Sequence, residues 1–367
     1  MNEKQPEPSK IMLEELQTKY SLLDFLIKKE VQKISHEMEV SIKAGDIVGL
    51  LYNAFLEQYK IPEAKKNETE VEKEKREHKL KSLNALCVRL VFCLYAEDAG
   101  IFGEKHNMFH DYLAHYEARD CRRALIELFK VLDTEEEDRE DYLEEELAQF
   151  PYVNGGLFAD ESVEIPQFTE EIRELLLTKA SEEFNWKDIS PTIFGAVFES
   201  TLNPETRRHG GMHYTSVENI HKVIDPLFMD ELEGEFETIQ TYKTLNVKRK
   251  KLMDFQEKLA HLKFLDPACG SGNFLTETYL SLRRLENKVL RVLYGEGQGV
   301  LGVAASDIIK VSIQQFYGIE INDFAVTVAK TALWIAESQM LDETKNIIYG
   351  LDGDFLSLIH ISEPTRL

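Results

Sequence analysis

A twelve-residue string at positions 264–275, Phe-Leu-Asp-Pro-Ala-Cys-Gly-Ser-Gly-Asn-Phe-Leu, constrains the fold of this chain more than any other feature. An apolar run ends at Asp266, a glycine-rich turn follows, and apolar residues then recur at helical spacing over residues 274–293. The pattern predicts a strand, a tight loop and a helix, the arrangement that holds a nucleotide-like ligand at the carboxyl end of a strand. Gly270 and Gly272 have no Cβ, so the loop can turn sharply and approach such a ligand closely.

A second strand is predicted at residues 315–320, and it ends in an acid, Glu320. A carboxylate after the second strand can accept hydrogen bonds from both hydroxyls of a ribose. Glu320 nevertheless follows Asp266 by 54 residues, whereas about 20 are usual. We attribute the excess to a glycine-rich surface loop at residues 294–307. The spacing alone leaves Glu320 an ordinary acid at the end of a strand.

The rest of the chain is expected to be helical, because strand patterns are scarce before residue 260. Residues 83–98 are strongly apolar and predict a buried helix that ends before Gly100. The charged stretch 61–80 is interpreted as a solvated linker or a frayed helix end. The other elements expected are helices at 11–60, 108–131, 139–149, 169–179, 191–200, 217–232, 233–263 and 323–340, and a third strand at 346–350.

The net charge of −23 argues against nucleic-acid binding through the whole surface. Acidic runs at 135–138 and 144–146 contribute much of this charge and are interpreted as solvated faces. A protein that acts on DNA can still be acidic overall if its basic surface is local. The lysine-rich helix expected at 233–263 fits two interpretations, contact with a phosphate backbone or an ordinary solvated face.

The cysteines and histidines indicate neither disulfides nor a metal site. The four cysteines form no Cys-x-x-Cys pair, which favours a reduced cytoplasmic protein. Three histidines at 106, 110 and 115 contain a single pair at i, i+4 spacing, too little for a metal centre. The sequence has no signal peptide and no apolar stretch long enough to cross a bilayer.

A Tyr214-Thr215-Ser216 element leads into a predicted helix at 217–232. Residues 215–218 match a capping box, and the N–H groups of a helix N-terminus can bind a ligand carboxylate. The alternative is that Thr215 does no more than cap its own helix.

Five strings together resemble the MmeI-like family, which comprises bacterial single-chain type II restriction–modification enzymes (the IIL and IIG groups) and their stand-alone methyltransferase relatives. The strings are residues 41–48, 86–102, 211–216, 264–275 and 317–326. The resemblance covers roughly residues 20–356. It implies an α plus α/β fold, in which a helical spacer domain precedes a Rossmann-like (class I) S-adenosylmethionine-dependent DNA methyltransferase domain.

The resemblance also divides the chain. Residues 1–20 are expected to be a disordered start, 21–150 the spacer domain and 151–358 the methyltransferase domain. Within the latter, motif X corresponds to 211–216, motif I to 264–275 and motif II to 317–323. Ser216 stands where many members of the family have proline.

For function, the resemblance implies a site-specific adenine-N6 methyltransferase of a bacterial restriction–modification system. Such an enzyme acts on double-stranded DNA and transfers the methyl group of S-adenosylmethionine to an adenine flipped out of the duplex. The residues that the resemblance assigns to cofactor binding are Tyr214, Thr215, Asp266, Pro267, Ala268, Cys269, Gly270, Gly272, Asn273, Phe274, Glu320 and Ile321.

The chain departs from the family in several respects. It has no Asn-Pro-Pro sequence, the element that supplies the family's catalytic residues, so no catalytic residue is assigned. No nuclease domain is recognisable, and residues 359–367 do not resemble the family and are interpreted as a non-native tail. We therefore expect an inactive amino-terminal portion of a methyltransferase, with an incomplete sheet and an open apolar edge at 263–266.

Two other interpretations stay open. A nicotinamide-dependent oxidoreductase predicts Gly-x-Gly-x-x-Gly, but Leu275 occupies the third glycine position. A non-enzymatic helical interaction module with a vestigial Rossmann part is compatible with the missing Asn-Pro-Pro. A substitution in the glycine loop would leave partner binding by such a module intact.

Overall fold

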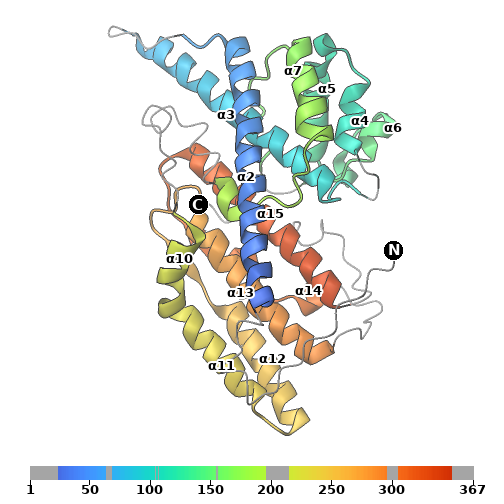
Figure 1. Cartoon of the computed structure of the whole chain (residues 1–367). Coiled ribbons are helices and arrows are strands. Elements are labelled where there is room, and N and C mark those ends of the chain that lie inside the picture. Colours follow the sequence, from blue (N-terminus) through green and yellow to red (C-terminus); the bar gives the residue numbers. More distant parts are fainter. Residues whose placement is uncertain are drawn as a thin grey trace, which may run out of the picture.

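The computed structural model describes residues 24–62, 68–103, 105, 107–153, 156–195, 215–295 and 305–348. Within these ranges the protein is mostly helical and contains a sheet of two strands. Figure 1 shows α2–α7 at the top and middle of the molecule and α10–α15 below and behind them. No helix among the described residues is long and apolar enough to cross a membrane.

Two long helices, α2 (Asp24–Tyr59) and α3 (Glu70–Asp98), pack against each other in the first half of the chain. Helix α3 begins at a capping box in which Thr69 and Glu72 satisfy each other's backbone N–H groups. It ends just before Gly100, which adopts a φ of 73°. The predicted helix end is thus confirmed. Of the two interpretations of residues 61–80, the linker is wrong for residues 70–80, which form the largely exposed first turns of α3 behind an intact capping box.

Shorter helices complete the first half, namely α4 (Met108–Ala114), α5 (Ala118–Leu132), η3 (Glu136–Asp138), α6 (Glu145–Ala148), α7 (Glu170–Glu174) and η4 (Leu175–Glu182). The single helix predicted at 108–131 is therefore two helices, and the one predicted at 139–149 shrinks to a single turn. The helix predicted at 169–179 is confirmed and runs on to Glu182 through η4, which consists of wide π turns.

A helical hairpin follows, formed by α10 (Val217–Ile224), η5 (Asp225–Met229), α11 (Asp230–Gln240) and α12 (Leu245–His261). The predicted helix at 217–232 continues to Gln240. The prediction of one helix over 233–263 is wrong, because the chain turns at residues 241–244 and α12 packs back along α11. The hairpin leads directly into the first strand.

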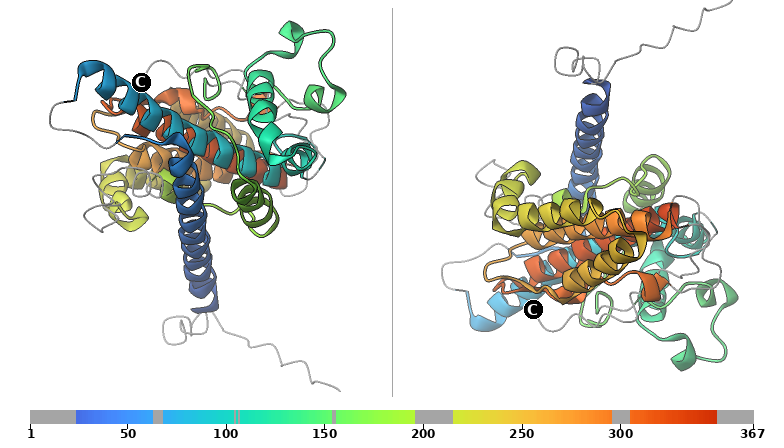
Figure 2. Two further views of the ribbon diagram at one scale, coloured as in Figure 1. Left: turned by 90° about the horizontal axis from the view of Figure 1, so that it is seen from above. Right: turned by 90° about the horizontal axis from the view of Figure 1, so that it is seen from below.

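The sheet consists of β1 (Phe264–Asp266) and β2 (Phe316–Gly318), paired in parallel with Phe264 beside Phe316 and Asp266 beside Gly318. Helix α13 (Asn273–Tyr294), α14 (Ala305–Ile308) and η6 (Ile313–Gln315) connect the strands, and α15 (Asp323–Ile347) follows β2. Helices α12, α13 and α15 lie side by side (Figure 2).

Both predicted strands are confirmed in shortened form, but the third strand is not. Residues 346 and 347 belong to the last turn of α15, because that helix stays buried against α13 to its end, and residues 349–350 lie outside the described ranges. The surface loop predicted at 294–307 contains the start of α14, and residues 296–304 lie outside the described ranges.

One face of the two-stranded sheet is covered and the other is open. On the covered face, the ring of Phe316 stacks on Phe264 at 5.2 Å and meets Tyr279 of α13 edge-on at 5.6 Å. On the open face, Leu265 is 63% exposed. Parallel strands normally have both faces covered. The open edge predicted at 263–266 is a separate feature: among the described residues β1 pairs only with β2, so its other edge has no neighbouring strand.

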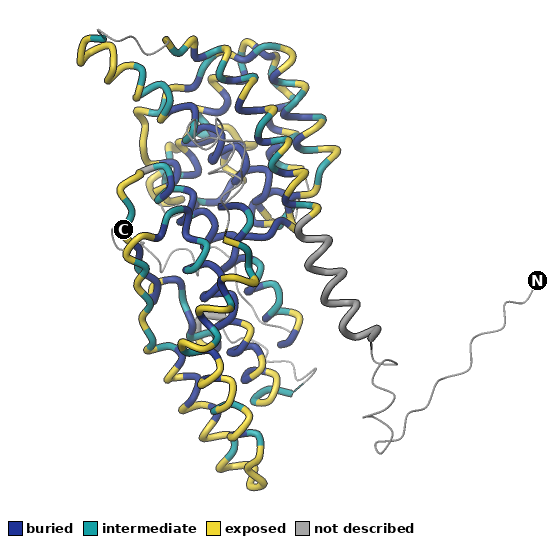
Figure 3. Tube along the Cα trace, turned by 60° about the vertical axis from the view of Figure 1, so that its left-hand side comes forward, coloured by how far each residue is buried: buried dark blue, intermediate teal, exposed yellow. Residues whose placement is uncertain are grey.

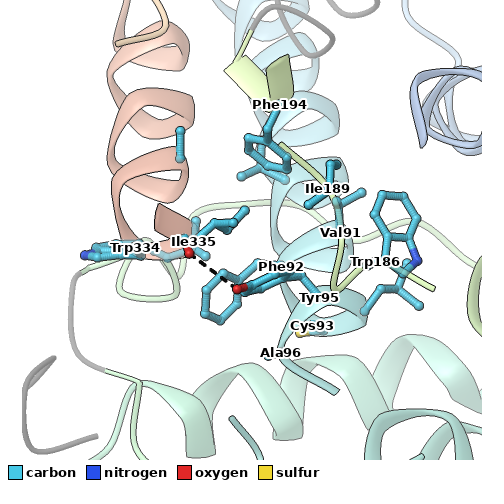
Figure 4. Packing of buried hydrophobic residues seen from close by; sticks show 14 of the residues in the cluster. Val91, Phe92, Cys93, Tyr95, Ala96, Trp186, Ile189, Phe194, Trp334 and Ile335 are labelled. Atoms are coloured by element: carbon cyan, nitrogen blue, oxygen red, sulfur yellow. Dashed lines mark hydrogen bonds between the residues drawn. The ribbon is translucent and has the colours of Figure 1, made fainter. Parts of the chain in front are cut away.

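The two halves of the chain share one hydrophobic core. Helix α3 packs on α15, where Phe92 meets Trp334 edge-on at 6.3 Å and the Tyr95 hydroxyl donates to the Ile335 carbonyl at 3.3 Å (Figure 4). Trp186, Ile189 and Phe194 are buried beside this contact. The helix after the second strand is therefore held by the first half of the chain.

Candidate cofactor site

The loop between β1 and α13 is held at the carboxyl ends of both strands. The Ile319 N–H donates to the Asp266 carbonyl at 2.9 Å, and the Cys269 N–H donates to the Ile319 carbonyl at 3.1 Å. Asp266 also accepts the Ala268 N–H on its side chain at 3.0 Å, which fixes the first turn of the loop. The strand–loop–helix predicted from the twelve-residue string is confirmed, with the helix beginning at Asn273.

The two glycines of the loop have different roles. Gly272 has a φ of 80°, and a Cβ there would lie 2.8 Å from the Ala329 Cβ of α15, so this glycine is needed for helix packing. Gly270 has a φ of 53°, but a Cβ there would meet nothing within 4 Å. The backbone at Gly270 therefore borders open space, as a loop that admits a ligand must.

Glu320 lies against this loop. Its Oε2 accepts the Gly270 N–H at 3.0 Å, and its Oε1 accepts the N–H groups of Ile321 and Asn322 at 2.8 Å each. Three backbone donors thus orient the carboxylate at the point where the two strands end. The structure brings Asp266 and Glu320 to one edge of the sheet despite the 54 residues between them.

Comparisons with known proteins match both halves of the chain. A family model described as the DNA-methyltransferase domain of MmeI matches residues 242–360, and one described as the MmeI helicase spacer domain matches residues 81–158. Among solved structures, the type IIL restriction–modification enzyme MmeI in complex with DNA is similar, with 39% identity and a TM-score of 0.68. That match covers 85% of this chain and 38% of the other. This chain belongs to the MmeI family.

Curated relatives agree with this assignment. DNA methyltransferase A of Bacillus subtilis (strain 168) is 38% identical over 332 residues, which cover 89% of this chain and 34% of that protein. A putative type II restriction enzyme and methyltransferase of Methanocaldococcus jannaschii is 26% identical over 336 residues, covering 77% of this chain and 26% of that protein. The chain thus spans about a third or less of the length of the curated relatives it matches.

The other predicted site residues of this MmeI-family chain differ in exposure. Cys269 is buried, and burial raises the pKa of its thiol, so it is a packing residue at neutral pH. Pro267 and Ala268 are exposed, while Asn273 and Phe274 are half-buried in the first turn of α13. The Ile321 side chain, directly after Glu320, is 97% exposed.

The element at 211–216, predicted to be motif X, is only partly described. Tyr214 lies outside the described residues, and Thr215 is exposed at the start of α10. The cap of α10 is Ser216, whose hydroxyl accepts the Asn219 N–H at 3.3 Å, so the interpretation of Thr215 as the cap is wrong. Thr215 is one residue too early for its side chain to close the first turn.

Sequence reasoning missed a polar cluster beneath the loop, centred on Glu277 of α13. Glu277 is 3% exposed and accepts the Thr192 hydroxyl at 2.8 Å, while its other oxygen lies 3.2 Å from His221 Nε2. His221 Nδ1 lies 2.8 Å from Asp225 Oδ1, so both ring nitrogens face carboxylates and both must be donors. The cluster ties α10 to α13, the helix that follows the glycine loop.

The protonation states follow from these contacts. The hydrogen bond to Glu277 raises the pKa of His221 to about 9. Burial opposes ionisation of Glu277, but the hydrogen bonds from His221 and Thr192 and the nearby charge of Arg284 together lower its pKa below the usual value. The cluster is therefore an ion pair at neutral pH.

Gly195 is a second missed residue. A Cβ on it would lie 2.8 Å from both the Asn273 side-chain oxygen and the Ser271 carbonyl, so the chain before residue 196 packs directly on the glycine loop. A glycine in a segment predicted to be helical was the signal available in the sequence.

No group of three or more histidine, cysteine or acidic side chains that could hold a metal ion occurs in the described ranges.

Proposed function

We propose that this chain supplies the S-adenosylmethionine-binding part of a DNA adenine-N6 methyltransferase of a restriction–modification system. In this proposal residues 21–150 are the spacer and residues 151–358 belong to a Rossmann-like, class I methyltransferase domain. The β1–α13–β2 unit, two parallel strands with a connecting helix, is the repeating element of such folds.

The observation that carries the proposal is the contact between Glu320 and the Gly270 N–H at the ends of two parallel strands. Ligands of open α/β sheets bind outside the carboxyl ends of the strands. The Glu320 carboxylate can accept the ribose hydroxyls there, and the open space at Gly270 leaves room for the chain that joins the ribose to the methionine end. The residues present thus fit the cofactor.

Ile321 supports the same assignment. An isoleucine that is 97% exposed gains nothing from the hydrophobic effect, yet it follows directly on the carboxylate that would hold the ribose. A flat adenine ring stacked on this side chain would bury apolar area of both. We assign the adenine end of the cofactor to Ile321 and the methionine end to Asp266, Gly270, Asn273 and the Tyr214-Thr215 element.

Methyl transfer requires more than this site. The bound cofactor supplies an electrophilic sulfonium methyl group, while the target amine must be flipped out and held for in-line attack. In the family this holding is the role of the Asn-Pro-Pro element, which the 367 residues do not contain. We therefore expect cofactor binding by this chain without methylation of DNA.

Equilibrium dialysis with labelled S-adenosylmethionine tests the proposal. We expect weak binding that is lost at least tenfold in Glu320→Ala, because removing an oriented acceptor of two hydroxyls costs about 1.4 kcal/mol or more. Glu237→Ala, which removes an exposed acid of α11, is the matched control and should bind like the parent chain.

Binding that is equal in the parent, the Glu320 variant and the control would contradict the proposed site. Displacement of the label by NADH in preference to S-adenosylhomocysteine would instead favour the oxidoreductase interpretation. A second incubation, with duplex DNA, should transfer no label to DNA. Transfer above the level of the Glu320 variant would contradict the assignment of the chain as non-catalytic.

A further inference from the structure

The turn of the α11–α12 hairpin concentrates positive charge in a strongly acidic chain. Residues 241–253, here called the hairpin tip, contain five cations and no acid, in a chain whose net charge is −23. The cations of the tip are Lys243, Lys248, Arg249, Lys250 and Lys251. Figures 1 and 3 show that the turn forms the lowest end of the molecule and that its trace is exposed.

The charges at the base of the hairpin are neutralised, but those at the tip are not. At the base, Lys258 of α12 pairs with Glu235 of α11 at 2.6 Å, and Lys288 of α13 pairs with Glu233 at 2.9 Å. At the tip, Lys243 and the run 249–251 are exposed and have no carboxylate within 4.0 Å in the described part of the chain. The tip is therefore an uncompensated cationic surface at one end of an acidic body.

The remaining side chains of the tip suit contacts to phosphate. Tyr242, Thr244 and Asn246 are exposed and carry hydroxyl or amide donors, whereas the hydroxyl of Thr241 donates to the Thr238 carbonyl at 2.7 Å. Phosphate oxygens in duplex DNA accept hydrogen bonds from arginine, lysine and these polar side chains, and such contacts position a protein without reading sequence. A negative body with one positive end would also approach DNA in a preferred orientation.

We propose that the hairpin tip binds the phosphate backbone of duplex DNA, independently of sequence, and so anchors DNA beside the methyltransferase part. The choice of DNA as the anionic partner rests on the proposed function. Helix α12 runs from the tip to β1, and its 17 residues span roughly 25 Å. At 3.4 Å per base pair, the anchored phosphates would lie within about seven base pairs of a base held at the cofactor loop.

Fluorescence anisotropy of the 367-residue chain with a labelled 20-base-pair duplex, titrated at several salt concentrations, tests the inference. The variant Lys250→Gln/Lys251→Gln removes two tip charges. The matched control Lys73→Gln/Lys75→Gln removes two exposed lysines from α3 and leaves the same net charge. We expect the tip variant to lose affinity on the order of tenfold at 50 mM salt and to reduce the slope of log K against log salt by about 1.8, since each phosphate contact contributes about 0.9.

Equal losses in the two variants would show that overall charge alone matters and would overturn the inference, as would unchanged binding in the tip variant. Vesicles of phosphatidylserine and phosphatidylcholine form a second arm. Tip-dependent binding to vesicles without tip-dependent binding to DNA would also overturn it. Equilibrium dialysis of the tip variant with labelled S-adenosylmethionine tests the proposed function separately. Cofactor binding depends on Glu320 and not on the tip, so the tip variant should bind the cofactor like the parent chain.

Discussion

Two buried arginines, one in each half of the chain, are held in different ways. Arg89 of α3 is 4% exposed and its hydrogen bonds go to neutral groups, the carbonyls of Leu157 at 2.8 Å and Asp160 at 3.0 Å, while its guanidinium lies over the rings of Phe129 and Phe158. The carboxylates of Asp160 and Asp133 act on Arg89 as nearby charges. Burial lowers the pKa of Arg89. It links α3 to a loop through groups that carry no formal charge.

Arg283 of α13 is 1% exposed and pairs instead with a carboxylate, Glu286, that is fully buried. Glu286 also accepts the Gln256 amide at 2.7 Å and the Lys310 N–H at 2.7 Å. This pair therefore holds α12 and the segment before β2 against α13. At these two positions the first half relies on hydrogen bonds from Arg89 to backbone carbonyls, whereas the position of β2 relies on a buried ion pair.

Breaking the ion pair should have the largest effect. Arg283→Met leaves the Glu286 charge buried without a partner, so we expect a loss of about 3–5 kcal/mol in the free energy of unfolding. Urea denaturation followed by circular dichroism measures it. The double variant Arg283→Met/Glu286→Gln should recover most of the loss, because its glutamine keeps an acceptor for Lys310 without a charge. No recovery would mean that the packing of Arg283, and not charge, dominates.

The matched change in the first half should cost less. Arg89→Met leaves the buried Leu157 carbonyl and the part-buried Asp160 carbonyl without this donor, and we expect a loss of about 1–3 kcal/mol in the same denaturation experiment. The loss should change little between pH 5 and pH 9, since Arg89 donates to carbonyls and the carboxylates of Asp160 and Asp133 act on it as nearby charges. A loss as large as that of Arg283→Met would remove the distinction between the two halves.

The smallest effect is expected at the cluster beneath the cofactor loop. The pKa of His221 is raised to about 9 in the folded protein. Its ion pair therefore contributes fully to the free energy of unfolding below the pKa of an unfolded histidine, about 6.5, and this contribution is lost as the pH rises through about 9. Glu277→Gln should therefore lower the free energy of unfolding by about 1–2 kcal/mol at pH 6. This figure is reduced for solvent screening, because His221 is half-exposed. The cost should shrink towards pH 10, as measured by urea denaturation across that range. A cost that does not depend on pH would identify a hydrogen bond and not an ion pair.

The sequence alone determined the elements whose signals are local. The strand, glycine loop and helix around residues 264–293 follow from a change of hydrophobic period and from two glycines, and the structure confirms them. The apolar run at 83–98 likewise predicted a buried helix that ends before Gly100. In both places the residues that decide the conformation are neighbours in the chain.

Tertiary structure decided what depends on partners far apart in sequence. The break between α11 and α12 contains neither glycine nor proline, so only packing of the two helices reveals it. The sequence spacing left the role of Glu320 undecided. Its place beside Gly270 depends on contacts between distant segments, such as those of Gln315, which donates to the Leu259 and Leu262 carbonyls at 2.8 Å each. His221 and Glu277 lie 56 residues apart and meet only when α10 packs on α13. Such contacts form only when distant segments pack together in the folded chain, and no local sequence pattern predicts them.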